Sequence, residues 1–250
     1  LYNSRLKQIR KSMLHVAMLG WPDTIDQLNA WPAGQTVKRN YVMFYSHFTD
    51  AFLPYLAINT SSLTESEKQL LDSMKFNEGM VALDVGAADG NYSTYLASRF
   101  PMVYAYDPNI VAAKAIRARS GLNVEAINIG LSSSRGEEDF YVHLTYLHNS
   151  MRIKYEDYSG YSYKVKTDTI DNRCLDKVGF IKIDTEGAEY DILLGAAETL
   201  KKTPSLMIEL HPPFKENEEK VRSLLSGYNK VEKVHKVDMQ SYLLCNVGRK

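Results

Sequence analysis

The most constraining feature of the sequence is a short apolar run that leads directly into two closely spaced glycines. The run Val81–Val85 is typical of a buried β-strand, and Gly86 and Gly90 follow it before a helical segment starts near Asn91. Glycines in such a turn permit backbone angles and close approaches that a Cβ atom would block. A strand, a tight turn and a helix in this order are typical of the cofactor-binding unit of a doubly wound α/β fold.

Acidic residues in this loop indicate which cofactor fits. Asp84 lies at the end of the strand and Asp89 lies within the turn. Both carboxylates would repel a dinucleotide pyrophosphate, and the spacing Gly-Ala-Ala-Asp-Gly does not match the dinucleotide pattern G-x-G-x-x-G. S-adenosylmethionine carries a sulfonium, an ammonium and no phosphate, so it suits an acidic loop. The predicted cofactor contacts here are Asp84, Gly86, Ala87, Asp89, Gly90 and Tyr92.

Two further strand candidates end in polar residues. The segment 103–107 ends in Asp107, about 20 residues beyond the loop, where a carboxylate binds ribose hydroxyls in doubly wound folds. The alternative for Asp107 is a solvated turn aspartate before Pro108. The segment 124–129 carries Asn128 near its end, where the amide could lie against an adenine edge or serve as a turn residue.

The strongest concentration of carboxylates follows a fourth strand candidate, Phe180–Asp184. Asp184, Glu186 and Glu189 fall within six residues at a strand-to-helix turn, a crowding that is costly unless the groups have a task. A fifth strand candidate, 205–213, carries Glu209 and His211. Ligands of an open α/β sheet collect beyond the carboxyl ends of its strands. We therefore expect one site that contains Asp84, Asp107, Asp184, Glu209 and His211.

The segment from about residue 76 to 214 resembles the FkbM family of S-adenosylmethionine-dependent methyltransferases. The most specific match is Ile181–Glu189 with Gly195 and Ala196 after it, and weaker matches fall at 83–87, 106–108, 149–151, 169–171 and 209–212. The resemblance implies a Rossmann-like class I methyltransferase fold. That fold has a mostly parallel seven-stranded sheet with a closing C-terminal antiparallel hairpin. Ala88-Asp89 departs from the asparagine that the family usually has in the loop.

Two regions lie outside this pattern. Residues 1–62 predict a helical extension or cap, whose aromatic segment 41–48 could line an acceptor pocket or form the core of the cap. Residues 63–250 are the predicted methyltransferase domain, in which 139–166 is a tyrosine-rich β insertion. The chain begins with Leu1 instead of Met, as we would expect of a trimmed chain or of a domain of a longer protein.

Composition narrows the partners. Thirty basic and thirty acidic residues give a net charge of zero, which does not favour a nucleic acid partner. Cys174 and Cys245 lack metal-ligand spacing and predict free thiols in a reducing compartment. No apolar run reaches the length of a membrane span. We therefore expect a cytoplasmic enzyme with a small-molecule acceptor, while the pattern indicates no oligomeric state.

The predicted catalytic residues are Asp184, Glu186, Glu209 and His211. Methyl transfer from a sulfonium is an in-line displacement, so the protein mainly positions the reactants and removes the acceptor proton. His211 is the first candidate base, although neighbouring carboxylates would favour its charged form. Alternatively, Asp184, Glu209 and His211 hold a divalent cation such as Mg²⁺, or His211 only bonds the backbone at the strand end.

The sequence favours transfer to oxygen. His211-Pro212-Pro213-Phe214 resembles the Asn-Pro-Pro-Tyr block of amino-group methyltransferases, but histidine replaces asparagine and the block follows the fifth strand instead of the fourth. We therefore predict O-methylation of a hydroxyl on a sugar or natural product. The alternatives are methylation of a nucleic acid or glycan polymer, a noncatalytic cofactor-binding module, and metal-dependent hydrolysis by the Asp184 cluster.

Overall fold

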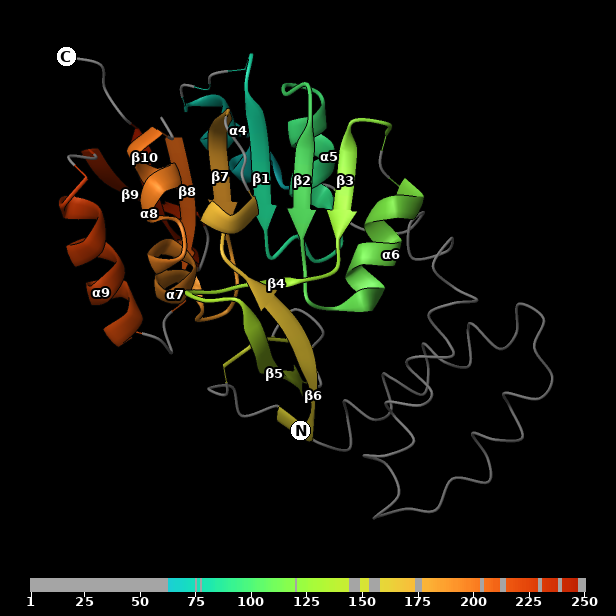
Figure 1. Cartoon of the computed structure of the whole chain (residues 1–250). Coiled ribbons are helices and arrows are strands. Elements are labelled where there is room, and N and C mark those ends of the chain that lie inside the picture. Colours follow the sequence, from blue (N-terminus) through green and yellow to red (C-terminus); the bar gives the residue numbers. More distant parts are fainter. Residues whose placement is uncertain are drawn as a thin grey trace. The chain divides into compact units, whose positions relative to one another are not determined.

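We analysed a computed structural model of the 250-residue chain (Figure 1). It describes residues 63–74, 76, 78–119, 121–143, 149–152, 158–173, 177–202, 205–211, 215–228, 231–237 and 240–246. The predicted N-terminal extension, Cys174 and the Pro212–Phe214 block lie outside these residues. The tyrosines of the insertion between 144 and 157 also lie outside them.

A seven-stranded sheet in the order β3-β2-β1-β7-β8-β10-β9 carries the fold. Its strands are β1 (Val81–Val85), β2 (Val103–Tyr106), β3 (Val124–Ile127), β7 (Val178–Ile183), β8 (Ser205–Leu210), β9 (Val231–Val237) and β10 (Gln240–Asn246). The first five run parallel, whereas β10 is antiparallel to both β8 and β9. The predicted Rossmann-like sheet, mostly parallel and closed by a C-terminal antiparallel pair, is confirmed.

Helices cover both faces of this sheet. The described helices are α4 (Glu65–Asp72), α5 (Asn91–Ala97), α6 (Ile110–Arg119), α7 (Glu189–Leu194), α8 (Ala197–Lys202) and α9 (Lys215–Ser226). Because side chains alternate along a strand, Ala82 and Phe180 pack with α4 and α5, while their neighbours Leu83 and Ile181 pack with α7 to α9. Ile116 of α6 packs on Ala105, which shares the face of the first group.

A second sheet of three strands lies beyond the carboxyl ends of β1 and β2 (Figure 1). It has the order β4-β6-β5, with β4 at Gly130–Leu131, β5 at Gly136–His143 and β6 at Tyr158–Asp168. Strand β5 begins three residues before the predicted insertion 139–166, and β6 ends two residues after it. Buried Phe140 and Val165 join the hydrophobic core of the main sheet, so the small sheet is packed against the methyltransferase fold.

Local sequence signals explain several element boundaries. A capping box starts α4, because the Thr64 side chain accepts from the Glu67 amide and Glu67 accepts from the Thr64 amide. Strand β3 ends at Ile127, so Asn128 lies just beyond it and not within it. Among the described residues, no helix has the length and apolar character needed to cross a membrane.

Candidate active site

The glycine loop brings two strands of the sheet into direct backbone contact. Gly86 and Gly90 have φ of +74° and +79°, as their predicted role requires, and Ala88 also has a positive φ of +46°. A Cβ atom on Gly86 would lie 1.8 Å from the Asp184 carbonyl oxygen, and one on Gly90 would lie 2.8 Å from Ile116. The loop therefore places the end of β1 against the end of β7 and the first turn of α5 against α6.

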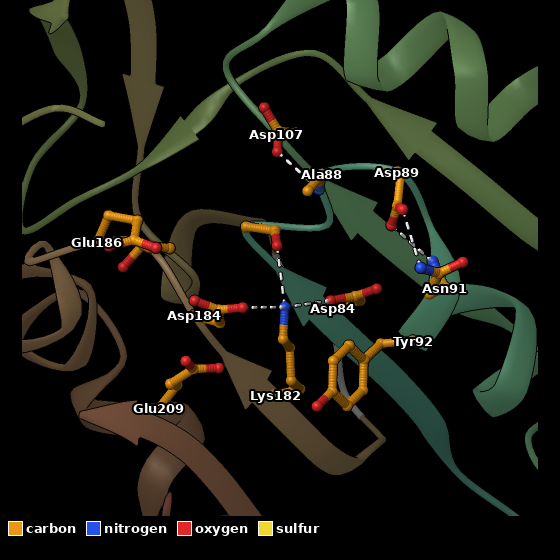
Figure 2. A network of polar contacts seen from close by, with 12 residues as sticks. Asp84, Ala88, Asp89, Asn91, Tyr92, Asp107, Lys182, Asp184, Glu186 and Glu209 are labelled. Atoms are coloured by element: carbon orange, nitrogen blue, oxygen red, sulfur yellow. Dashed lines mark hydrogen bonds and ion pairs between the residues drawn. The ribbon is translucent and has the colours of Figure 1, made fainter. Parts of the chain in front are cut away.

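A buried ion-pair network lies beneath this loop, and its centre is Lys182 (Figure 2). The Lys182 Nζ atom donates to the Gly86 carbonyl at 2.9 Å and lies 3.3 Å from Asp84 Oδ1 and 3.4 Å from Asp184 Oδ2. Ser93 Oγ donates to the other Asp84 oxygen at 2.6 Å. Asp84 is 0% exposed and Lys182 is 3% exposed. Asp84 thus bonds a cation and a donor, as predicted, but both belong to the chain itself.

The charge of Lys182 is maintained by its neighbours. Burial by itself lowers the pKa of Lys182, but the carboxylates of Asp84, Asp184 and Glu209 outweigh it and raise that pKa above its ordinary value. The ammonium also lies 4.8 Å from the centre of the Tyr92 ring, within cation–π range. Register explains the pair, because Asp84 and Lys182 are direct partners on the adjacent strands β1 and β7.

Asp107 lies at the carboxyl end of β2, where its side chain orders two backbone segments. Its oxygens accept from the Ala88 amide at 2.9 Å and the Asn109 amide at 2.8 Å. Burial raises the pKa of Asp107 to about 6, although those two amides act in the opposite direction. The Asn128 amide donates to the carbonyls of Asp107 and Pro108 at 3.0 and 2.9 Å. Asn128 therefore stabilises the loop after Asp107, which is the role expected of a turn residue.

Four carboxylates surround His211 just beyond β8. Its Nε2 atom lies 3.2 Å from Glu186 Oε1, 3.4 Å from Asp184 Oδ1 and 3.6 Å from Glu209 Oε1, while Nδ1 lies 3.5 Å from Glu189 Oε1. Burial by itself lowers the pKa of His211, but Glu186, Glu189 and Asp184 outweigh it and raise that pKa to about 11. This environment favours the imidazolium, which has no lone pair to accept a proton. The structure thus argues against His211 as the first candidate base.

Glu209 is the buried carboxyl group of this cluster whose charge is least favoured. Burial raises the pKa of Glu209 to about 8, and the Asp184 carboxylate acts in the same direction. His211 and Lys182 oppose this shift. Register places Glu209 opposite Tyr242 of β10, on the face of the sheet that holds Asp84 and Lys182. Figure 2 shows Glu209 and Glu186 beside Asp184.

Glu189 has a larger role than the helix-dipole charge that its sequence position predicts. Its Oε1 atom accepts from the Thr185 amide at 3.2 Å and the Gly187 amide at 3.0 Å, and Asn217 donates to Oε2. Burial by itself raises the pKa of Glu189, but the neighbouring His211 and the Gly187 amide outweigh it and lower that pKa below its ordinary value. Glu189 thus folds the 184–188 loop around its own side chain. The sequence places Glu189 in the first turn of a helix, and this position alone does not indicate that its side chain organises the preceding loop.

The small sheet also contributes to the site, through the segment after β5. Ser150 Oγ donates to the Glu186 carbonyl at 2.7 Å and lies 3.2 Å from the Thr185 carbonyl. Arg152 continues the contact with ion pairs to Glu138 and Asp191. The resemblance to the FkbM family includes residues 149–151 but does not indicate a role for them. The structure identifies Ser150 as the contact between the insertion and the carboxylate loop.

A single cavity joins the cofactor loop to the carboxylates. Its lining residues are Val85, Gly86, Ala88, Tyr106, Asp107, Pro108, Asn109, Ile129, Gly130, Leu131, Phe140, Asn149, Ser150, Met151, Asp184, Thr185, Glu186 and Glu209. The predicted site residues Gly86, Asp107, Asp184, Glu186 and Glu209 therefore come together there.

The other predicted site residues are not part of the lining of this cavity. They are Asp84, Ala87, Asp89, Gly90, Tyr92, Asn128 and His211. Asp89 accepts from the backbone and side-chain amides of Asn91 at the start of α5, and Tyr92 donates to Glu67 at 2.9 Å. Their direct contacts with a cofactor stay predictions, whereas their contacts within the chain support the loop.

The model of the methyltransferase FkbM domain matches residues 84–232, more than half of the chain. The chain belongs to the FkbM methyltransferase family. The match includes every predicted catalytic and cofactor-binding residue, from Asp84 to His211. The predicted class of enzyme, an S-adenosylmethionine-dependent methyltransferase, is thereby confirmed.

Individual proteins of known sequence or structure match this chain over part of its length and part of their own. The AMB antimetabolite synthetase AmbE from Pseudomonas aeruginosa is 30% identical over 52% of this chain and 8% of its own length. The crystal structure of methyltransferase FkbM from Methylobacillus flagellatus is 16% identical, with a TM-score of 0.49, over 69% of this chain and 45% of that chain. The M. capricolum TrmK structure with S-adenosyl-homocysteine is 15% identical, with a TM-score of 0.41, over 74% and 68% of the two chains. This chain thus spans less than half of the first two proteins.

Proposed function

We propose that this FkbM domain transfers the methyl group of S-adenosylmethionine to a hydroxyl oxygen of a small molecule. The observation that carries the proposal is the shared cavity, which Gly86 and Asp107 line on the cofactor side and Asp184, Glu186 and Glu209 line on the carboxylate side. Ligands of an open α/β sheet bind at this edge. A methyl donor and a hydroxyl acceptor bound there would lie next to carboxyl groups that can take the proton of the acceptor.

The residues on the cofactor side fit S-adenosylmethionine. The positive φ values of Gly86 and Ala88 turn the backbone around the cavity, so the ligand can approach the main chain closely. Asp107 lies at the end of β2, where it can accept ribose hydroxyls. When bound, the cofactor supplies a methyl group on a sulfonium that leaves readily. The lining contains four carboxyl groups, Asp107, Asp184, Glu186 and Glu209, and this acidic character suits the positive charge of the cofactor.

On the acceptor side, we infer that Glu209 removes the hydroxyl proton. Glu209 lines the cavity, whereas His211 is not part of the lining and is surrounded by four carboxylates. A pKa of about 8 leaves a fraction of Glu209 ionised near neutral pH, and this carboxylate can accept the proton of a hydroxyl. The methyl carbon would then bond to the acceptor oxygen as its bond to sulfur breaks, while the proton stays on Glu209. Asp184 and Glu186 would orient the acceptor.

Two observations support a small acceptor over a polymer. The chain has no net charge, so it lacks the overall basic character that favours nucleic acid. Its relative AmbE is named for the synthesis of an antimetabolite, a small molecule. Methylation of a glycan or nucleic acid, and a module that binds cofactor without turnover, are the other outcomes of the tests below.

The cofactor assignment is tested by calorimetric titration with S-adenosylhomocysteine. We expect binding to the wild type that weakens at least tenfold in Asp107→Ala. Asp139→Ala is the matched control, because its carboxylate is exposed and pairs only with Lys164 among the ion pairs given for the described residues. Absence of binding to the folded wild type would overturn the cofactor assignment. Equal affinities of the two variants would overturn the role of Asp107.

The reaction is tested by incubation with S-adenosylmethionine and size-matched alcohols, amines and glycan oligomers. S-adenosylhomocysteine formation reports turnover, and mass spectrometry with NMR locates the new methyl group. We expect a methyl ether on a small alcohol and a loss of at least a hundredfold in kcat for Glu209→Gln, with cofactor affinity retained. Methylation only of amines or of the oligomers would contradict the proposal, as would full activity of Glu209→Gln.

A further inference from the structure

Three potential metal ligands converge where β7 and β8 end. One ligand atom from each of Asp184, Glu186 and His211 lies within 4.8 Å of the other two. His211 Nε2 is 3.4 Å from Asp184 Oδ1 and 3.2 Å from Glu186 Oε1. Ligands about 2.0–2.2 Å from a common ion, at tetrahedral or octahedral angles, lie roughly 3.0–3.5 Å apart. The spacing of the histidine from both carboxylates therefore fits coordination of one small cation.

The second ring nitrogen of His211 provides an independent observation. His211 is 8% exposed in its side chain, and its Nδ1 atom is buried with no hydrogen-bond partner among the described residues. Nδ1 faces Glu189 Oε1 at 3.5 Å. Metal-binding histidines usually donate their other N–H to a carboxylate, which fixes the ring orientation. Glu189 is itself 2% exposed and fixed by Gly187 and Asn217, so it is suited to this role.

The backbone of the carboxylate loop is also held in an uncommon conformation. Glu186 has a φ of +55°, which non-glycine residues rarely adopt. Ser150 stabilises this conformation by donating to the Glu186 carbonyl at 2.7 Å. Such backbone strain persists where surrounding contacts enforce it and is common at ligand sites. Here it directs the Glu186 carboxylate toward His211 instead of toward solvent.

We propose that Asp184, Glu186 and His211 bind one divalent cation of the Mn²⁺ or Zn²⁺ type, oriented by the Glu189–His211 contact. Carboxylate oxygens with one neutral imidazole suit these ions, and the ion would displace the proton of His211 Nε2 on binding. Asp184 and Glu186 also line the cavity, so a cation held by them would face an acceptor hydroxyl and polarise it beside Glu209. This catalytic role rests on the proposed function, whereas cation binding does not.

Binding is tested by titrating Mn²⁺ and, separately, Zn²⁺ into chelator-stripped protein, with calorimetry for both and electron paramagnetic resonance for Mn²⁺. We expect one ion per chain. Glu186→Gln and His211→Gln should each raise the Kd at least tenfold, and Glu189→Gln about tenfold to a hundredfold. Glu198→Gln, an exposed carboxylate that pairs with Lys201, should leave the Kd unchanged. Failure to bind either ion, or equal affinity of Glu186→Gln and the wild type, overturns the proposal.

A parallel titration with S-adenosylhomocysteine separates this proposal from the proposed function. Cofactor binding by stripped protein that binds neither ion would overturn the cation site and leave the methyltransferase assignment intact. Ion binding without cofactor binding would do the reverse. Because Glu186 is more accessible than His211, Glu186→Gln keeps the test valid if His211→Gln fails to fold.

Discussion

Replacement of Lys182 by methionine tests the most deeply buried part of the site. Methionine preserves much of the side-chain stem and removes the ammonium. Within the part of the chain that the structure describes, Asp84 would then keep its hydrogen bond from Ser93 and lose its ion pair. It would remain fully buried. Removing one partner of a buried ion pair leaves an uncompensated charge, which costs about 3–5 kcal/mol. We expect Lys182→Met to lower the free energy of unfolding by this amount.

The structure indicates which contact dominates that loss. At 3.3 and 3.4 Å, each pair has a Coulomb energy of about 5 kcal/mol at an effective dielectric constant of 20, before desolvation is subtracted. Asp184 has 26% of its side chain exposed, so water screens its share, whereas Asp84 has no such access. The double variant Asp84→Asn/Lys182→Met removes both buried charges. We therefore expect it to recover at least half of the stability lost by Lys182→Met.

The assay is urea unfolding of the wild type, both single variants and the double variant at pH 7. Lys201→Met is the control, because Lys201 forms an exposed pair whose loss should change stability by less than about 1 kcal/mol. The raised pKa of Lys182 means that its contribution is complete below the ordinary value of 10.5 and is lost only as pH rises through the raised one. A loss below 1 kcal/mol for Lys182→Met, or strictly additive effects in the double variant, would refute this reasoning.

Three further changes test the loops around the cavity. Binding of S-adenosylhomocysteine should weaken about tenfold from pH 7 to pH 5, because Asp107 must ionise to accept ribose hydroxyls. Burial raises the pKa of Asp107 to about 6, although the amides of Asn109 and Ala88 and the charge of Lys182 act in the opposite direction. Calorimetry should find this pH dependence absent in Asp107→Asn. Gly86→Ala should abolish cofactor binding or folding, because its Cβ atom would lie 1.8 Å from the Asp184 carbonyl oxygen. Gly136→Ala is the control. Its Cβ atom would lie 3.9 Å from the nearest neighbour, so we expect urea unfolding to show a stability change of less than about 1 kcal/mol. Ser150→Ala should lower the free energy of unfolding by about 1–2 kcal/mol in the same measurement, because it removes the hydrogen bond to the Glu186 loop. An unchanged unfolding midpoint would show that this hydrogen bond does not stabilise the loop.

The sequence predicted the sheet and the position of the site well because both depend on local patterns. Apolar runs ending in polar residues located β1, β2, β7 and β8, and parallel strands bring such ends to one edge. The same reasoning brought Asp107, Asp184 and Glu209 into one cavity. A cytoplasmic location and the role of residues 1–62 remain predictions.

What the sequence could not specify was which partner each charge would take. Asp84 appeared available to a ligand because its neighbour across the sheet, Lys182, is almost a hundred positions away in the chain. The signal existed, since a lysine within the apolar run of β7 must be paired if that run is buried. His211 posed the opposite difficulty. Its role depends on four carboxylates at distances between 3.2 and 3.6 Å, and sequence spacing carries no such detail.

The position of β10 inside the sheet affects how this domain is made. Strand β10 lies between β8 and β9, although it follows both in the sequence, and it pairs with β8 from Ser205 to Leu210. During synthesis, β8 and the Glu209 it carries must therefore wait beside an open position until residues 240–246 leave the ribosome. The family match ends at residue 232, before this strand begins. A fragment cut at that boundary would keep only two residues of β9 and would leave the edge of β8 unpaired, which promotes aggregation, so expression of the domain requires the chain through Asn246.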